Sequence, residues 1–436
     1  MDVIILGAGI SGVSLAHFLQ EKKIIKKITL LEKEKTPGGL LRSFKVKGIA
    51  YDIGPHIIFS KHKEILDKNI KMLNNNVHKI RRSNKIIYKN RYVKYPFENE
   101  LFKLPKDDLQ YCLNSFLNNP FEKFKYVNMQ QFFLSIFGEG ITRTYLEPYN
   151  RKIWKFDPTF MDTQMVVRVP KPPKQDIIKS AKGIKTEGYK HQLYFHYPKK
   201  NGIQALFDNY LDTLDKKKNN LITGQKIIKI FKKNKKTFIK TNKGETSCQV
   251  LFSTIPLNEF CHLYQDTPKD ILDSAKNLKY NSIIITVVNL KGNIAGKNFA
   301  FMVPDKDIIF HRLSKLDFLG KNYSIKGTTT FLVEITFREG DVLSKMNNKN
   351  IINKIYEGLK KIKFCKKFSD INFFEIKKFK YAYVIYDLDH RKNVDKILKY
   401  FKKNKIYLAG RLGSWEYLNS DQVIFQSKTM IKKLFK

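Results

Sequence analysis

Cysteine, long apolar runs and repeats are all scarce or missing in this sequence. The chain has only 4 cysteines in 436 residues, at positions 112, 248, 261 and 365, without CxxC spacing. This pattern excludes a disulfide framework and the common cysteine-based metal sites, so we expect reduced thiols, a cytoplasmic protein and no bound metal. No apolar run approaches the ~18 residues that a membrane-spanning helix requires. Because an apolar strand pattern starts at Asp2, we also expect no signal peptide.

Acidic residues are half as numerous as basic ones, 40 against 82, which gives a formal net charge of +42. A charge of this size can indicate nucleic acid, anionic lipid or phosphorylated ligands. The lysines, however, are spread along the whole chain beside many Ile and Asn residues, as an A/T-rich genome also produces, and no nucleic-acid motif accompanies them. We therefore expect a solvated basic surface and no nucleic-acid partner. A peripheral contact with a membrane stays open as an alternative, and the oligomeric state is not inferred.

The start of the chain has the pattern of a dinucleotide-binding unit. A short apolar run, residues 2–6, leads into Gly7, Gly9 and Gly12, which are spaced Gly-x-Gly-x-x-Gly, and then into a helical pattern. A second apolar run ends at Glu32, about 20 residues after the last glycine, where a carboxylate can bind an adenosine ribose. Such glycines let the backbone turn tightly and approach a pyrophosphate at the start of the helix.

A second glycine pair indicates which dinucleotide binds. The segment around Gly38, Gly39 and Arg42 resembles the second glycine motif of the amine-oxidase-like FAD flavoproteins, where a basic residue approaches the cofactor. An ordinary Pro-Gly-Gly turn would explain these glycines alone. Both motifs in this order favour FAD over NAD.

The order of apolar patterns along the chain predicts an α/β protein. We expect a Rossmann-type FAD-binding domain assembled from discontinuous segments, a helical substrate lobe, and a sheet-based domain over the flavin. The expected boundaries are residues 1–95, 199–258 and 400–436 for the FAD domain, 96–190 for the helical lobe, and 191–198 with 259–399 for the sheet domain.

Several strings in this order resemble the UDP-galactopyranose mutases, especially their eukaryotic branch. The closest match is Gly410-Arg411-Leu412-Gly413-Ser414-Trp415-Glu416-Tyr417, followed by Asn419, Asp421 and Gln422. The other matching segments are residues 54–60, Tyr95-Pro96-Phe97-Glu98, residues 148–154 with Met161 and Arg168, residues 310–314, Asn322-Tyr323-Ser324 and residues 381–386.

The resemblance implies a reaction without net redox change. Reduced FAD attacks the anomeric carbon of a UDP-linked sugar through its N5 atom, and the sugar changes its ring size. The implied cofactor is FAD that is kept reduced, with NAD(P)H as an external reductant. The implied substrate is a UDP-linked nucleotide sugar, with polysaccharide biosynthesis as the setting.

The resemblance also implies roles for individual residues. Arg168 and Arg312 would clamp the diphosphate as planar guanidinium groups, and His56 would face the flavin. The remaining implied substrate contacts are Tyr95, Phe97, Tyr323, Tyr383 and Tyr417. The implied cofactor contacts are Gly7, Gly9, Gly12, Glu32, Gly38, Gly39, Arg42, Gly54, His56, Ile228, Gly410, Arg411, Asp421 and Gln422. Without the resemblance, each arginine could equally belong to a structural ion pair and each tyrosine to the core.

The sequence departs from the mutase pattern at three positions around the expected substrate pocket. Glu98 replaces a Gln, Met165 replaces a Trp, and Val384 replaces a Pro. These departures keep a second hypothesis open, a redox flavoenzyme of the amine oxidase or protoporphyrinogen oxidase type that acts on a glycan or its precursor. A third hypothesis, a flavin-binding scaffold on acidic surfaces, rests on charge alone.

Overall fold

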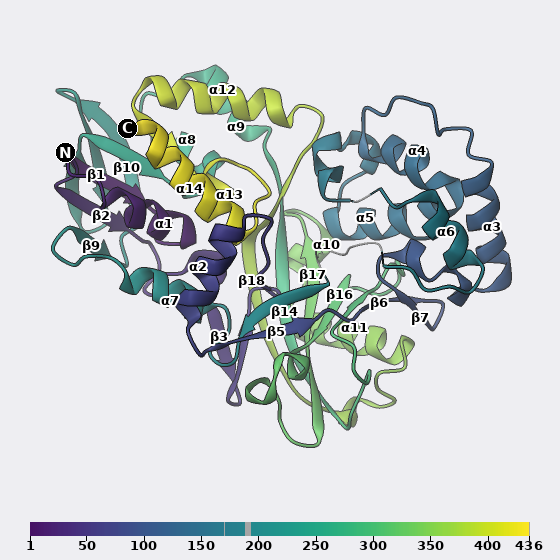
Figure 1. Cartoon of the computed structure of the whole chain (residues 1–436). Helices are drawn as coiled ribbons and strands as arrows, with labels where there is room; N and C mark the ends of the chain where they lie inside the picture. The colour runs from purple at the N-terminus through teal and green to yellow at the C-terminus, as the bar shows by residue number, and fades with distance from the viewer. Residues whose placement is uncertain (170, 188–192, 436) are drawn as a thin grey trace.

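The structure is a computed structural model that describes residues 1–169, 171–187 and 193–435, with the backbone alone at Arg168. Figure 1 shows three parts: a nucleotide-binding part that contains both ends of the chain, a helical lobe on the opposite side, and a large sheet between and below them. Within the described residues, no helix is both long enough and apolar enough to cross a membrane.

A parallel sheet of five strands forms the nucleotide-binding part. Its strand order is β19-β13-β1-β2-β9, and every neighbouring pair is parallel. The strands are β1 (Asp2–Leu6), β2 (Lys27–Leu31), β9 (Asn219–Ile222), β13 (Val250–Ser253) and β19 (Ile406–Leu408). Side chains alternate across β1, so that Val3 and Ile5 enter one core while Ile4 and Leu6 enter another. Both faces of a parallel sheet are usually buried, and the alternate side chains of β1 show that both faces of this sheet are buried in apolar cores.

Helices and a small sheet cover these two faces. On one face lie α1 (Ile10–Leu19), α2 (Lys63–Leu73), α7 (Gln204–Asp212) and α14 (Ser420–Leu434). Toward the other core lie α8 (Leu257–Leu263), α9 (Lys269–Lys276), α12 (His390–Lys403) and the antiparallel strands β10 (Ile227–Lys233), β11 (Lys236–Thr241) and β12 (Gly244–Cys248). The short helix α13 (Gly410–Gly413) joins β19 to α14.

The large sheet has seven strands in the order β18-β14-β17-β16-β15-β6-β7. Only the β15–β6 pair is parallel. The strands are β6 (Asn84–Tyr88), β7 (Arg91–Lys94), β14 (Lys279–Lys291), β15 (Ala300–Met302), β16 (Arg312–Lys315), β17 (Thr328–Phe337) and β18 (Ile371–Ile385). Helix α11 (Asn348–Lys361) packs on one face through Ile351, Ile355 and Leu359, and α10 (Val342–Lys345) precedes it.

The helical lobe contains the main helices between residues 96 and 187. They are α3 (Lys106–Leu117), α4 (Met129–Ile141), a π-helical turn (Thr142–Leu146), α5 (Glu147–Trp154) and α6 (Lys174–Ala181), with short 3-10 turns at Phe97–Asn99, Leu101–Lys103, Pro158–Phe160 and Thr163–Arg168. Two antiparallel strand pairs connect the parts, β3 (Ser43–Val46) with β4 (Ile49–Asp52) and β5 (Val77–Arg81) with β8 (Tyr194–Pro198).

Two of the boundaries expected from the sequence need correction. Residues 84–94 belong to the large sheet rather than to the cofactor domain, because β6 pairs with β15 far along the chain. Helices α8, α9 and α12 pack with β10 and β19 on the nucleotide-binding part, although residues 259–399 were assigned to the sheet domain. Apolar patterns predict that a strand or helix forms, but not which distant segment it packs against.

Candidate functional site

The first glycine turn leaves no room for side chains. Gly7 has a φ of +93°, and a Cβ on it would lie 2.6 Å from the Thr254 hydroxyl oxygen. A Cβ on Gly12 would lie 2.0 Å from the carbonyl oxygen of Gly7. Both positions therefore require glycine so that β1 can turn directly into α1. No side chain caps the start of α1, and the buried Ser11 hydroxyl has no hydrogen-bond partner among the residues that the structure describes. The first turn thus offers unused amide and hydroxyl donors to an anion.

The second glycine pair lies against the first. The amide of Gly38 donates to the carbonyl of Ala8 at 2.9 Å, and Gly9 forms a parallel bridge with Gly38. A Cβ on Gly9 would meet the Cα of Gly39 at 3.6 Å, an ordinary contact distance. The two glycine segments thus form a cradle of bare backbone, which fits the pyrophosphate region of a dinucleotide. Arg42 donates to the carbonyl of Gly39 at 3.2 Å and stays near this cradle.

An acidic side chain closes the far end of the cradle. Glu32 is buried, and its two carboxylate oxygens accept hydrogen bonds from the amides of Ala8 at 2.8 Å and Glu34 at 2.9 Å. The carboxylate is thus fixed in place and retains acceptor capacity for a ribose. The amide of Gln225 donates a hydrogen bond to the carbonyl of Glu32, just before β10 begins. Ile228 lies on β10, and the side chain of Ile228 is exposed. A role for Ile228 in cofactor binding stays a prediction.

The C-terminal motif packs against the start of α1. Gly410 has a φ of +79°, and a Cβ on it would lie 2.2 Å from the Ser11 hydroxyl oxygen. Asp421 accepts a hydrogen bond from Ser60 at 2.6 Å, and Gln422 accepts one from the amide of Asn419 at 2.9 Å in a capping box. These two side chains fix the start of α14, and their predicted contact with a flavin is untested.

An ion pair between an arginine and a glutamate lies on the face of the large sheet that points toward the nucleotide-binding part. Arg312 on β16 stands opposite Glu334 on β17, and its Nε and Nη2 atoms each lie 2.5 Å from a Glu334 carboxylate oxygen. Glu334 is fully buried, whereas 26% of the Arg312 side chain is exposed. A Cβ on Gly54 would lie 3.3 Å from this carboxylate, so the loop after β4 contacts the pair. Glu334 thus holds the guanidinium plane in one orientation with Nη1 directed away from the carboxylate.

His56 lies on the same loop. Its Nδ1 atom is 3.0 Å from the carbonyl of Gly54. Burial, together with the charges of Arg411 and Arg312, lowers the pKa of His56 to about 4. The imidazole is therefore neutral at physiological pH. Asp52 anchors the start of this loop by accepting hydrogen bonds from Ser43 and Tyr197, each at 2.6 Å.

Aromatic residues complete the cluster. Arg411 lies over the ring of Tyr417 at 4.4 Å and over that of Tyr383 at 5.5 Å. Trp154 at the end of α5 packs edge-on against both tyrosine rings at 5.6 Å. Burial is the main cause that raises the pKa of the Tyr383 phenol, so it is protonated and able to donate. Tyr149, also on α5, has a raised pKa from burial, which the charge of Arg312 opposes.

Three residues of this cluster were not assigned a role from the sequence. Tyr149 and Trp154 belong to the string of residues 148–154 that resembles the mutases, and their spacing on α5 was the available signal. Glu334 sits within the apolar run of β17, and the sequence alone gives no signal that it pairs with Arg312.

Two predicted substrate contacts, Tyr323 and Phe97, have side chains that are buried and paired with other protein groups, and their contact with a substrate stays a prediction. Tyr323 is fully buried, and its hydroxyl donates to the carbonyl of Pro198 at 2.8 Å and accepts from the amide of Gly202 at 3.1 Å. Its hydrogen-bonding capacity is thus used to fix the chain after β8. Phe97 is also fully buried and stacks on Tyr145 at 4.9 Å in the core of the helical lobe.

Of the other predicted substrate residues, Tyr95 lies beside the cluster, and the side chain of Arg168 cannot be placed. The side chain of Arg168 lies outside the described residues, so its role as a clamp stays a prediction. Tyr95 is half-buried, and its phenol interacts electrostatically with that of Tyr149, which places it beside the cluster.

The three departures from the mutase pattern are buried. Met165 and Val384 are 5% and 0% exposed, and Glu98 is 4% exposed. Burial raises the pKa of Glu98 to about 7. The carboxyl group is therefore substantially protonated at neutral pH, where it can donate a hydrogen bond as the amide of a glutamine does.

This burial predicts that Glu98 makes stability depend on pH. The folded protein binds a proton at Glu98 more tightly than the unfolded chain does, so stability falls as pH rises from about 4.5 toward 7. Glu98→Gln should leave the melting temperature unchanged near pH 4 and raise it at pH 8.5, where the unfolding free energy should increase by up to about 3 kcal/mol. Differential scanning calorimetry at both pH values checks this, and an equal shift at both would contradict it.

Comparisons with known proteins agree with this geometry. The family described as an NAD(P)-binding Rossmann-like domain matches residues 5–68. All-trans-retinol 13,14-reductase of Danio rerio is 36% identical over 67 residues, which are 15% of this chain and only 11% of that relative. The chain therefore matches only a small part of this curated relative, centred on the cofactor-binding pattern.

Solved structures match over the whole chain. A structure of reduced UDP-galactopyranose mutase has a TM-score of 0.90 at 24% identity and covers 99% of this chain and 95% of its own. A protein of Exiguobacterium sp. 255-15, provisionally assigned as a protoporphyrinogen oxidase, has a TM-score of 0.79 at 16% identity and covers 99% and 98%. The expected α/β fold is confirmed, and the resemblance to the mutase-like flavoproteins is confirmed at the level of the fold.

Proposed function

We propose that this chain, which has the fold of the mutase-like flavoproteins, is an FAD-dependent isomerase that interconverts the pyranose and furanose forms of a UDP-linked sugar. The observation that carries the proposal is the Arg312–Glu334 pair beside His56, Tyr383, Tyr417 and Arg411. A cluster of guanidinium and phenol donors suits a diphosphate, and it lies at the sheet face that the glycine cradle approaches.

The residues around the cradle fit FAD. Bare backbone at Gly9 and Gly39, unused donors at the start of α1 and the fixed carboxylate of Glu32 match a pyrophosphate followed by a ribose. When bound and reduced, the flavin would supply the nucleophile for the anomeric carbon, with NAD(P)H as the proposed reductant.

The chain itself would bind and orient the substrate. Arg312 presents Nη1 to a phosphate oxygen while Glu334 keeps the guanidinium from rotating. Tyr383 and Tyr417 would donate hydrogen bonds from their phenol groups to the departing diphosphate and so stabilise the charge that develops on it. His56 is neutral and adds no positive charge beside the flavin position. None of these residues needs to transfer a proton, which suits a reaction whose nucleophile is not a side chain.

Removing one phenol should weaken substrate binding. Tyr383→Phe keeps the ring that packs on Trp154 but deletes a donor to a charged oxygen, so kcat/KM should fall about tenfold with the flavin spectrum unchanged. Tyr381→Phe is the matched control on the same strand, because that hydroxyl donates to Glu259 at 2.8 Å. Steady-state kinetics with a UDP-sugar compare the two variants. Equal effects of the two substitutions would show that Tyr383 does not contact the substrate.

The alternative function is a redox flavoenzyme of the amine oxidase or protoporphyrinogen oxidase type. The buried departures at Glu98, Met165 and Val384 favour it, because they alter the expected sugar pocket. Flavin absorbance during anaerobic turnover discriminates between the two. An isomerase converts many equivalents of UDP-sugar while the flavin stays reduced. In a redox enzyme without an external electron acceptor or donor, one flavin is reduced or oxidised for each product molecule that forms.

A further inference from the structure

A second cavity lies on the outer side of the nucleotide-binding part, separate from the cluster around Arg312. This outer groove has a volume of about 600 Å³ and lies between α12, β19 and α14. Its walls are formed by Leu398, Ile406, Tyr407, Leu408, Leu418, Phe425, Met430 and Leu434, with His62, Lys402, Gln422, Gln426, Thr429 and Lys433 as polar members. Figure 1 shows α12 and α14 as the neighbouring helices near the C-terminus.

Helix α14 carries a second set of apolar side chains, which its core covers only in part. Ile424 and Ile431 are buried in the core that α14 shares with α1 and the parallel sheet. Phe425, Met430 and Leu434 are half-buried and line the outer groove. A surface helix usually keeps one apolar face. The second face is therefore available to a ligand, and from position 422 to 434 it is about 18 Å long.

The strand at the floor of the groove adds to this opening. Within the described residues, β19 is the edge strand of the parallel sheet and pairs only with β13. Tyr407 faces the groove and is half-buried. An apolar surface of this kind that is rimmed by polar residues is typical of a binding site.

The polar rim of the groove is positive. Lys402 and Lys433 come from the last turns of α12 and α14, and both are exposed. No acidic residue is among the described residues that line the groove. The nearby acids are already paired, Glu64 with Lys428 and Asp395 with Arg391 at 3.4 Å. At its other end the groove is lined by uncharged Gln422 and by His62, which stacks on Phe425.

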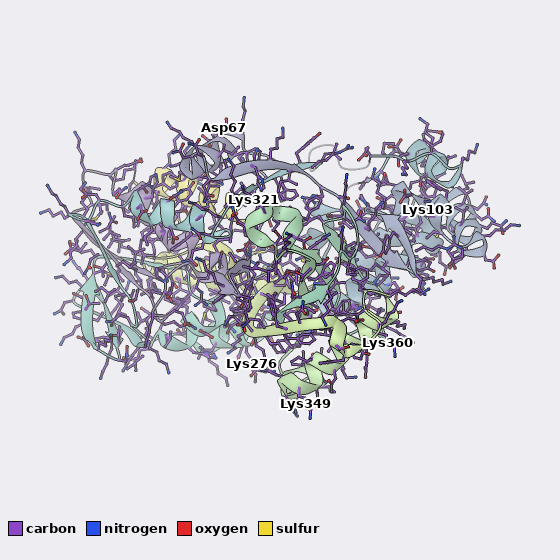
Figure 2. The ribbon with its side chains drawn as sticks, turned by 90° about the horizontal axis from the view of Figure 1, so that it is seen from below. Asp67, Lys103, Lys276, Lys321, Lys349 and Lys360 are labelled. Atoms are coloured by element: carbon purple, nitrogen blue, oxygen red, sulfur yellow. The ribbon has the colours of Figure 1, made fainter. Side chains whose placement is uncertain are left out.

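The positive charge of the rim favours an anionic ligand over a second copy of this chain as the occupant of the outer groove. A second copy of this chain would bring a lysine rim against another surface of a protein with a net charge of +42. Figure 2 shows lysines of well-separated elements, among them Lys103, Lys276, Lys321, Lys349 and Lys360, so the positive charge is spread over several parts of the molecule. An anion with an apolar tail satisfies both the lysine rim and the apolar walls.

We propose that the outer groove binds a single-chain aliphatic anion, a carboxylate or phosphate on one unbranched hydrocarbon chain. The head group lies between Lys402 and Lys433, and the chain runs along the stripe of Met430 and Phe425 toward Leu418. The volume of the groove lies within the range of small-molecule sites. Gln422 at the far end of the groove is also a predicted flavin contact, but the lysine rim and the apolar walls that carry this proposal belong to neither the proposed flavin site nor the sugar-nucleotide site.

Isothermal titration of the purified full-length protein with dodecyl phosphate, below its micellar concentration, tests this proposal. We expect saturable binding of one equivalent, and about tenfold weaker binding of decyl phosphate because each methylene contributes to burial. Inorganic phosphate and dodecyltrimethylammonium should not saturate a site. Binding of inorganic phosphate alone, or binding only to phosphatidylglycerol vesicles and not to dodecyl phosphate, would overturn the proposal.

Variants on one helix locate the site. Lys433→Glu should weaken dodecyl phosphate binding at least tenfold, and Met430→Glu should do the same by placing a charge in the wall. Lys432→Glu is the matched control, because its exposed side chain is next along α14 and does not line the groove. Thermal melting and flavin content establish that each variant is folded. Equal affinity of the Lys433 and Lys432 variants would place the binding elsewhere and defeat the proposal.

Discussion

Replacement of Arg312 by alanine should lower turnover of a UDP-sugar by about 10²–10³-fold while the protein keeps its flavin. The guanidinium is the cation that the buried carboxylate of Glu334 orients, with both contacts at 2.5 Å. Its removal deletes the oriented donor to the departing diphosphate, which gains charge in the transition state. Anaerobic steady-state assays with the flavin reduced by dithionite measure the loss.

A structural effect must be separated from this catalytic one. Arg312→Ala leaves the Glu334 carboxylate buried without its counter-ion, which can cost about 3–5 kcal/mol of stability. The double variant Arg312→Ala/Glu334→Gln removes that unpaired charge and should recover stability but not activity. If the double variant regains full turnover, Arg312 does not bind the substrate.

Gly9→Ala should yield a folded protein that binds FAD at least about 100-fold more weakly. The added Cβ would meet the Cα of Gly39 at 3.6 Å, so the empty cradle accepts the methyl group without a clash. The methyl group then occupies the space through which a pyrophosphate approaches the backbone. Flavin absorbance of the purified variant, with its circular dichroism and melting curve, measures cofactor binding and folding separately.

Gly12→Ala provides the contrast. At this position a Cβ would lie 2.0 Å from the Gly7 carbonyl oxygen, so the turn itself must deform. This variant should lose thermal stability as well as flavin. If Gly9→Ala retains full flavin content, the cradle between the two glycine segments is not the cofactor site.

The sequence predicts local features of this molecule well. Gly7, Gly12 and Glu32 lie within one strand-turn-helix-strand unit, where spacing alone determines which groups meet, and the structure brings them together. The hairpin of β6 and β7 was misassigned because its partner β15 lies more than 200 residues further along the chain. Strand β12 was not expected, since its sequence Gly-Glu-Thr-Ser-Cys lacks an apolar pattern and its pairing with β11 comes from the hairpin.

Side-chain direction limits what a motif can predict about the site. Tyr323 and Phe97 stand in strings that resemble the mutases, yet both point into the core and meet other protein groups. Conversely, Glu334 lies in an ordinary buried strand and is revealed only by its cross-strand register with Arg312. Residue identity predicts what chemistry is available, whereas the fold decides which atoms can reach a ligand.

Incubation with UDP-galactofuranose under anaerobic conditions, with and without dithionite, tests the central claim most directly. The products are separated by chromatography and counted against the flavin present. The account predicts conversion to UDP-galactopyranose over many turnovers with the reduced protein and none with the oxidised protein. Conversion that is equal in both states, or no conversion in either despite bound FAD, would contradict it.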